Sequence, residues 1–504
     1  MKSISLAMIA VLLGGITAGC SAGGSQSAEK HTETTASDKV AEKPVRIEVL
    51  KPGAGLPKHE EDALKQAIDK KLNIDLDMVM VGASDYKNKV NVRLAAGNYP
   101  DVFELDPGEI KAFADKGLLL DLTPYIPKLK TLIDFQGEDH FKSGWITGKQ
   151  LAIGSISRDG NIPFNTFWIR KDWLDKLGLQ PPSTLDEFKA VARAFTEQDP
   201  DGNGKKDTFG LTGFEFGAFS PLFGSFGVGS PGTLYLKNGK LTDALFDPGM
   251  KEALTYLKSL IESGGVDMEF ITNKNGLAME KAYQGKAGII YAGWQSILRK
   301  DNEEKWKSVN PNAEWIQLAS PGGLSDASFD YGKASHLYVI SKAAEKDPVK
   351  LQKILDFFNY IASPEGLNLV SYGIDGRHYK NIGGKIQPNE LMDKEGGYFS
   401  LYQMAGRKEI EYLSIRFPYA DKALQFTKDQ RRINELNSNL YSYPDGFNKN
   451  DLERFTKDEL IKFIFGKRPI SEYDQFLAAL KQNFKYDAYM EHAAALLKEQ
   501  NMLK

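Results

Sequence analysis

The fold class is set by the stretch VRIEVL at residues 45–50, where apolar and charged side chains alternate as they do in a strand. The stretches after it predict helix 60–72, strand 74–81, helix 84–96 with Ser84 as its N-cap, strand 101–105, and a helix that begins at Pro107. Strands that alternate with helices in this way predict parallel strands joined by crossover helices. We therefore expect an α/β fold.

A second region of the same style begins near residue 165. It predicts strand 167–170, helix 172–177 ended by Gly178, a helix capped by Ser183 with Asp186 three residues on, strand 288–291, strand 337–340, helix 349–361 and helices over 451–504. Two regions of this kind suit a chain of 504 residues, because a single core rarely grows that large.

Charge and hydropathy exclude several classes of protein. The formal net charge of −3 gives no electrostatic basis for binding nucleic acid. Beyond the first twenty residues, no apolar run approaches the roughly 20 residues needed to span a bilayer. Cys20 is the single cysteine, so the folded part of the chain is expected to hold together without a disulfide.

The first residues predict export. Lys2 precedes an apolar run over residues 4–16, and residues 17–20 read Thr-Ala-Gly-Cys, as at a signal cleavage site (signal 1–19). Small residues before a cysteine are similar to the bacterial lipobox, in which Cys20 becomes the lipid-bearing N-terminus. The alternative is an ordinary signal peptide that contains a cysteine, since Thr17 stands where Leu is usual. Residues 20–43 are poor in apolar side chains and are expected to be a disordered tether.

A short acidic loop carries the spacing of a calcium site. Oxygen-bearing side chains occupy its alternate positions, a glycine permits the turn at Gly204, and one backbone carbonyl faces inward: Asp199, Asp201, Asn203, Lys205 (through its carbonyl) and Asp207. Gly210 stands where an EF-hand has its bidentate Glu, so a sixth ligand would come from Thr208, a distant side chain or water. We expect a structural Ca²⁺; the alternative is a polar turn without metal.

Motifs for common enzyme chemistries are absent from the sequence. There is no His-Glu-x-x-His, no G-x-S-x-G elbow and no phosphate-binding G-x-x-x-x-G-K. Acidic residues are plentiful, so a carboxylate pair for glycoside hydrolysis stays open as an alternative. The acidic pairs that stand out, such as Glu303 with Glu304, lie on faces predicted to be solvated, so no pair is positively indicated.

Several stretches together resemble one family. They are AAGNYPDV at 95–102, KGLLLDLTPY at 116–125, WIRKDWLDKLG at 168–178, the acidic loop, and YGIDGRHY at 372–379. With the lipobox and the tether they are similar to the extracellular solute-binding lipoproteins of carbohydrate ABC transporters, family 1, in the long Gram-positive branch called LplA-like. The resemblance covers nearly the whole chain.

The resemblance implies a two-lobed fold like that of periplasmic binding proteins, with a hinge and a ligand cleft between the lobes. It places the first lobe at 44–157 plus 316–375 and the second at 158–315 plus 376–504. It further implies an anchored receptor on the extracellular face of the cell membrane, monomeric, that delivers an oligosaccharide to the permease subunits. A peptide or signalling ligand, or a surface polysaccharide-degrading enzyme, are the alternatives.

Sugar recognition needs aromatic rings for the C–H faces of a pyranose and charged groups for its hydroxyls. The candidates are Trp294, Trp168, Glu104, Asp106, Arg377 and Tyr379. Glu104 and Asp106 end a predicted strand, where open α/β sheets present ligand groups. The alternatives are core packing for each tryptophan and a helix cap for Asp106.

Overall fold

The computed structural model describes residues 43–158, 165–294, 296–323, 325–328, 336–500 and 502–503. The chain divides into two compact units, Met1–Lys43 and Pro44–Lys504, and every helix and strand named below belongs to the second unit. Cys20, the signal and the tether predicted for residues 20–43 thus lie outside the described residues, apart from Lys43. No helix within the described ranges is both long and apolar enough to cross a bilayer.

The first sheet has six strands in the order β17-β6-β14-β3-β1-β2. Their bounds are Val45–Pro52 (β1), Ile74–Val81 (β2), Val102–Leu105 (β3), Ile153–Arg158 (β6), His336–Ile340 (β14) and Gly406–Lys408 (β17). β1 runs parallel to β2 and to β3, as predicted for alternating strands and helices. β14 runs antiparallel to both of its neighbours, β3 and β6, so the sheet is mixed.

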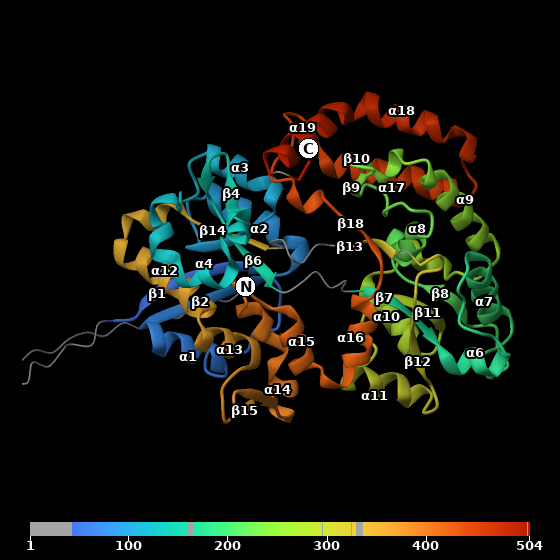
Figure 1. Cartoon of the computed structure of the whole chain (residues 1–504), viewed down its shortest axis with the longest axis horizontal. Helices are drawn as coiled ribbons and strands as arrows, with labels where there is room; N and C mark the ends of the chain where they lie inside the picture. Colours follow the sequence, from blue (N-terminus) through green and yellow to red (C-terminus); the bar gives the residue numbers. More distant parts are fainter. Residues whose placement is uncertain are drawn as a thin grey trace, which may run out of the picture. The chain divides into compact units, whose positions relative to one another are not determined.

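Helices bury the apolar sides of this sheet. They are α1 (Ala63–Leu72), α2 (Ala83–Ala95), α3 (Pro107–Asp115), α4 (Lys130–Gln136), α12 (Pro348–Ala362) and α13 (Pro364–Tyr372). In Figure 1, α12 lies beside α4 and β1, both of which it contacts. α1 begins at the cap Asp62, whose carboxylate accepts N–H bonds from the first turn. α2 begins after Gly82, one residue before the predicted cap Ser84, which is therefore not the N-cap.

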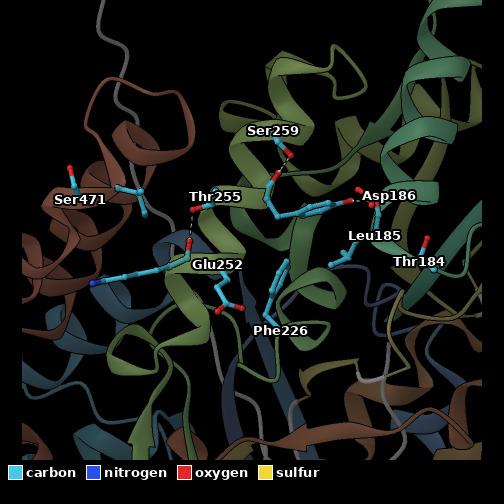
Figure 2. Close-up of a pocket in the computed structure, with 11 residues that line it drawn as sticks. Thr184, Leu185, Asp186, Phe226, Glu252, Thr255, Ser259 and Ser471 are labelled. Atoms are coloured by element: carbon cyan, nitrogen blue, oxygen red, sulfur yellow. Dashed lines mark hydrogen bonds between the residues drawn. The ribbon is translucent and has the colours of Figure 1, made fainter.

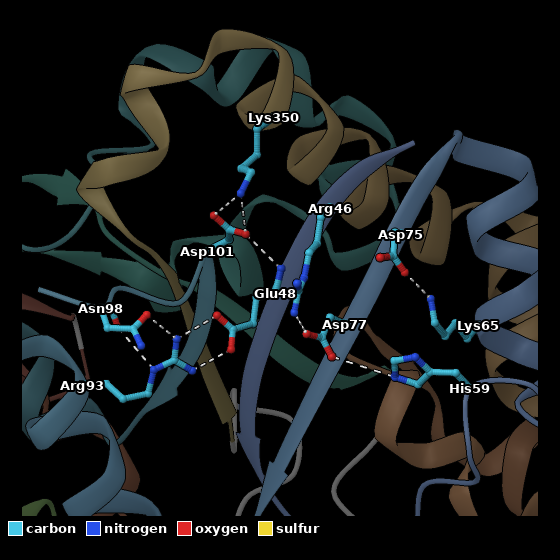
Figure 3. Close-up of polar contacts among 10 residues, drawn as sticks. All are labelled: Arg46, Glu48, His59, Lys65, Asp75, Asp77, Arg93, Asn98, Asp101 and Lys350. Carbon is cyan, nitrogen blue, oxygen red and sulfur yellow. Dashed lines mark hydrogen bonds and ion pairs between the residues drawn. The ribbon is translucent and has the colours of Figure 1, made fainter. Parts of the chain in front are cut away.

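Charged side chains occupy alternate positions in the first half of β1 and of β2: Arg46, Glu48, Asp75 and Asp77 (Figure 3). Glu48 accepts two hydrogen bonds from the guanidinium of Arg93, at 2.6 and 2.8 Å, and its backbone N–H donates to Asp101. Lys350 of α12 donates to both oxygens of the Asp101 carboxylate at 3.0 Å. These contacts tie α2 and α12 to β1 and to Asp101, the residue before β3.

The second sheet has four strands in the order β12-β7-β11-β8. They are Asn165–Arg170 (β7), Phe209–Thr212 (β8), Ala287–Gly293 (β11) and Trp315–Leu318 (β12). β7 is antiparallel to both β11 and β12, whereas β11 and β8 are parallel. Gly288 lies where α7 crowds the sheet, since a Cβ there would stand 2.2 Å from the ring of Phe195.

Helices surround the second sheet. They are α6 (Lys171–Leu177), α7 (Leu185–Glu197), α9 (Gly249–Glu262), α10 (Asn275–Tyr283) and α11 (Lys300–Val309). α6 ends at Gly178, as predicted, in the left-handed conformation. The capping box of α7 is formed by Thr184 and Glu187, one residue later than predicted, although Ser183 also donates to the Glu187 carboxylate.

The C-terminal helices pack on a hairpin of the second region. α17 (Lys449–Ile464), α18 (Tyr473–Asn483) and α19 (Tyr486–Glu499), red in Figure 1, confirm the helices predicted after residue 451. The hairpin consists of β9 (Leu234–Lys237) and β10 (Lys240–Asp243). The buried carboxylate of Asp243 accepts hydrogen bonds from Tyr486 Oη at 2.6 Å and from Leu245 N at 2.8 Å. Burial raises the pKa of Asp243 to about 6, although both hydrogen bonds oppose the shift.

The chain crosses between the two regions at other points than the resemblance implied. β12 extends to Leu318 in the second sheet, so the boundary placed at 316 falls too early. β17 pairs with β6, and residues 398–405 contribute to the core beneath the first sheet, so the segment from 376 does not belong wholly to the second lobe. β13 (Ser325–Ser328) pairs in parallel with β18 (Arg432–Asn434), and these strands contact α8 and β9, respectively, in the second region.

Candidate functional site

Polar side chains gather where β1 and β3 end. Lys51 lies near the end of β1, Glu104 near the end of β3, and Asp106 directly after β3. His336 begins β14, which is antiparallel to β3, so it lies at the same edge of the sheet. The carboxyl ends of parallel strands are where open α/β sheets present groups to ligands.

Glu104 is the centre of this edge. Its side chain is 12% exposed, and Oε1 lies 2.8 Å from Nδ1 of the half-exposed His336. The second oxygen, Oε2, is buried and has no hydrogen-bond partner among the described residues. An unpaired buried carboxylate oxygen costs free energy, so this atom is suited to accept a hydrogen bond from a ligand.

The buried Lys51 lies close enough to Glu104 for the two charges to interact. Its Nζ donates to Tyr338 Oη and to the carbonyl of Leu401, both at 3.0 Å. Burial lowers the pKa of Lys51 to about 8, and the nearby charge of Glu104 acts in the opposite direction. Tyr86 Oη from α2 lies 3.0 and 2.8 Å from the carbonyl oxygens of Leu50 and Glu104, and so clamps the ends of β1 and β3 together.

Asp106 occupies the N-cap position of α3, but its side chain makes no capping hydrogen bond. The side chain is exposed and close enough to Tyr86 for its charge, like that of Glu104, to raise the pKa of that tyrosine, after burial as the main cause. The helix-cap alternative therefore does not describe this residue. Two carboxylates, Glu104 and Asp106, are brought to one edge as predicted.

The aromatic candidates lie elsewhere. Trp168 and Trp294 are each only 2% exposed and belong, with Tyr379, to one apolar cluster of the second region. Trp294 meets Phe417 edge-to-face, with ring centroids 6.1 Å apart. A ring that stacks on a sugar needs an open face. The structure buries both tryptophans, as the core-packing alternative expects, and Tyr379 is buried in the same cluster. Their contact with a ligand stays a prediction.

Arg377 is held by an ion pair with Glu395. Its guanidinium donates to Glu395 at 2.9 Å, and the same carboxylate oxygen lies 2.8 Å from Nε2 of the buried His378. The hydrogen bond from His378, followed by the charge of Arg377 and a hydrogen bond from it, lowers the pKa of Glu395. Arg377 is thus engaged in holding the turn before β15 (Tyr379–Ile382) to α14 (Glu390–Glu395).

The sequence predictions omitted Lys51, His336 and Tyr338. His336 could have been chosen from the sequence, since it immediately precedes the predicted strand 337–340. Its side-chain contact with Glu104 depended on β14 being antiparallel to β3, which the pattern of alternating strands and helices did not predict. Lys51 and Tyr338 meet across β3, a contact between residues far apart in the chain.

The acidic loop follows α7 and precedes β8, as expected. The carboxylate of Asp199 accepts N–H bonds from Gly202, Asn203 and Gly204 at 3.0–3.1 Å. Asn203 Nδ2 donates to Asp201 at 2.7 Å and to Asp207 at 3.1 Å. A hydrogen bond shared with Asp201 lowers the pKa of Asp199, whereas burial, followed by the same bond, raises that of Asp201.

These loop residues suit a hard cation in their chemistry. Three carboxylates and an amide oxygen are ligands that Ca²⁺ prefers. Across the ranges that the structure describes, however, no three acidic, histidine or cysteine side chains already converge closely enough to hold a metal. In the loop, the NH₂ group of Asn203 donates hydrogen bonds to both Asp201 and Asp207, and so lies between these two carboxylates. An amide turned by half a rotation would present its oxygen there instead.

The sequence matches the model of one protein family, described as bacterial extracellular solute-binding protein, over residues 57–367. The chain belongs to this family. Among curated relatives of this solute-binding protein is the polygalacturonan/rhamnogalacturonan-binding protein YtcQ of Bacillus subtilis, 28% identical over 94% of each chain. Another is the lipoprotein LipO of the same species, 28% identical over 85% of this chain and 82% of the relative.

Solved structures share the fold of this solute-binding protein. An alginate-binding protein without calcium ion aligns with a TM-score of 0.68 and 18% identity over 90% of this chain and 98% of its own. The substrate-binding protein FusA of Streptococcus pneumoniae, in complex with kestose, aligns with the same score and identity over 90% and 99%. At this identity the likeness concerns the fold alone, and it is that of two-lobed solute-binding proteins.

Proposed function

We propose that this protein captures an oligosaccharide outside the cell and delivers it to the permease of an ABC transporter. The observation that carries the proposal is the buried Oε2 of Glu104, which has no hydrogen-bond partner among the residues that the structure describes. It lies beside the exposed Asp106 and His336, at the edge of the first sheet where β1 and β3 end, which we call the ligand edge. Sugar hydroxyl groups are hydrogen-bond donors that carboxylates accept well. The binding names of the relatives, polygalacturonan/rhamnogalacturonan for YtcQ and fructooligosaccharide for FusA, support a saccharide over a peptide.

Glu104 and Asp106 are the residues proposed to contact the sugar. Lys51 is proposed as a positioning residue, because it keeps Tyr338 and the Glu104 charge in place without reaching the surface. His336, which is exposed, can donate a hydrogen bond to an acceptor on a ligand, beside the carboxylate of Glu104 that accepts one. Both neutral and acidic sugars are thus compatible with this edge.

The test is calorimetric titration with kestose, raffinose and trigalacturonic acid as probes. Glu104→Gln and Asp106→Asn are each expected to weaken binding of the preferred probe by about 10- to 150-fold, as for a lost hydrogen bond to a charged group of about 1.5–3 kcal/mol. Asp458→Asn, at an exposed aspartate of α17, is the matched control. Unchanged affinity in both variants would refute the assignment of this edge. Chromatography of the recovered probe addresses catalysis, since shortened products would favour the enzyme alternative.

We further propose that Cys20 carries lipid and anchors the protein to the extracellular face of the membrane as a monomer. The small residues before Cys20 and the relative named lipoprotein LipO support the anchor. Cys20→Ser is expected to abolish incorporation of labelled palmitate and to release the protein into the medium. Labelling that persists in Cys20→Ser would contradict the proposal. Light scattering of the soluble part, residues 44–504, tests the monomer.

Calcium binding by the acidic loop is proposed as a structural device. Asp199, Asp201, Asn203 and Asp207 would supply side-chain oxygens and Lys205 its carbonyl, and the charge of the ion would offset the repulsion among the three carboxylates. At a free ion concentration one hundred times Kd, binding adds about 2.7 kcal/mol to the free energy of unfolding. We expect a chelator to lower the melting temperature, and Asp207→Asn to abolish that response. An identical melting temperature with and without chelator, and no calcium in the purified protein, would refute it.

A further inference from the structure

A groove of about 720 Å³ opens on the second region, away from the residues of the ligand edge (Figure 2). Four separate segments line it: the first turn of α7, the residue Phe226 after α8 (Ser220–Gly224), one face of α9, and the 3-10 turn Ile470–Glu472. Cavities of roughly 300–1,000 Å³ are typical of small-ligand sites. None of the residues at the ends of β1 and β3 lines this groove.

The floor of the groove is aromatic and held in place. The rings of Phe226 and Tyr256 lie 5.8 Å apart at an angle of 49°, and both are partly buried against the core of the second region. Tyr256 Oη donates to the carbonyl of Leu185 at 2.7 Å, which fixes the ring. Figure 2 shows Phe226 and Leu185 at the centre of the groove. A rigid aromatic floor binds a ligand at low cost in conformational entropy.

The rim of the groove supplies free acceptors. The Asp186 side chain is 96% exposed, and the ion pair that it forms with Lys189 is as long as 3.9 Å. Glu252 on α9 is exposed, and within the described residues no hydrogen bond or ion pair engages its carboxylate. Lys251 is already paired with Asp474 at 2.8 Å. The rim therefore offers two exposed carboxylates. That of Asp186 has one long ion pair, that of Glu252 has none within the described residues, and the hydroxyl groups of the groove add further acceptors.

We propose that this groove is a second saccharide site, which takes one or two rings of a neutral glycan. Aromatic rings match the C–H face of a pyranose, and carboxylates accept from its hydroxyl groups. The surplus negative charge of Asp186 and Glu252 disfavours uronates, phosphate and acidic peptides. The site would hold part of a glycan on the receptor independently of the ligand edge. The inference extends the proposed function but stands on different residues.

The test measures saturation transfer from protein to cellotetraose, maltotetraose and trigalacturonic acid, followed by titration. We expect transfer to one of the neutral sugars, weakened about tenfold in affinity by Phe226→Ala and also by Glu252→Gln, which is exposed and leaves folding intact. Phe214→Ala, an exposed phenylalanine of the same region outside the groove, is the matched control and is expected to change nothing. Trigalacturonic acid is expected not to respond to either groove variant.

Variants at the ligand edge and in the groove test the two sites independently. Glu104→Gln is expected to leave the groove-dependent signal unchanged, so failure of the ligand edge and failure of the groove give different results. The inference is overturned if no neutral sugar signal depends on Phe226 and Glu252, or if trigalacturonic acid competes equally well. It is also overturned if chemical-shift changes at the groove arise only from a second copy of the protein or a peptide.

Discussion

The buried carboxyl group of Asp243 makes a pH-dependent contribution to stability that can be calculated from the structure. The pKa of this group rises from 3.8 to about 6 on folding. Between these values the folded state binds the proton more tightly than the unfolded state does. The free energy of unfolding therefore falls as pH rises from about 4 to about 6. A shift of about two units corresponds to about 3 kcal/mol, all of it lost above pH 6.

The perturbation is Asp243→Asn, which removes the charge and keeps one oxygen for Tyr486 or Leu245. The amide adds a penalty because its NH₂ group faces a backbone N–H or a hydroxyl, but this penalty does not depend on pH. The stability of Asp243→Asn relative to the unmodified protein should therefore improve by up to about 3 kcal/mol between pH 4 and pH 7.

Urea unfolding at fixed ionic strength and fixed calcium, monitored by tyrosine and tryptophan fluorescence, measures the difference at each pH. Asp458→Asn is the control, because an exposed carboxylate gives no such slope. Parallel profiles for Asp243→Asn and the unmodified protein would refute the reasoning, since they would mean that Asp243 is solvated or that α19 is detached from β10 in solution.

Three further outcomes depend on contacts in the two sheets. Gly288→Ala forces a Cβ toward the ring of Phe195 and is expected to lower the free energy of unfolding by about 1–3 kcal/mol, measured by urea titration. Arg93→Ala leaves Glu48 without two hydrogen bonds and should cost about 2 kcal/mol, with a smaller loss at 1 M salt measured by the same titration. Trp168→Phe should remove about 1–3 kcal/mol of core packing and so lower the melting temperature. Calorimetry should find a ligand affinity within twofold of that of the unmodified protein. A selective loss of affinity would instead place Trp168 in the ligand site.

Local patterns predict much of the fold. Strand 74–81 has the bounds that its pattern predicts, and the helix from Pro107 and the stop at Gly178 are also confirmed, because each depends on residues adjacent in the chain. The direction of β14 is not predictable in this way. It depends on how a segment more than two hundred residues away enters the sheet, and no periodicity records that.

The site is predicted in part for the same reason. Glu104 and Asp106 follow a strand, and the rule that ligands bind at strand ends needs only local information. Trp294 also follows a strand, yet it turns into the core, because β11 is flanked by β7 and β8 and covered by the cluster around Phe417. A tryptophan at a strand end is buried or exposed according to its neighbours in space, which a single sequence does not give.

The pairing of β17 with β6 has a consequence for how the chain is made. Gly406 lies opposite Ile156, which is about 250 residues earlier in the chain. β17 is therefore synthesised long after β6, the strand with which it pairs. Only glycine fits at position 406, since a Cβ would stand 2.0 Å from the carbonyl oxygen of Ile156. Contacts between such distant segments form slowly. The amino-terminal sheet therefore stays incomplete until four fifths of the chain has been made.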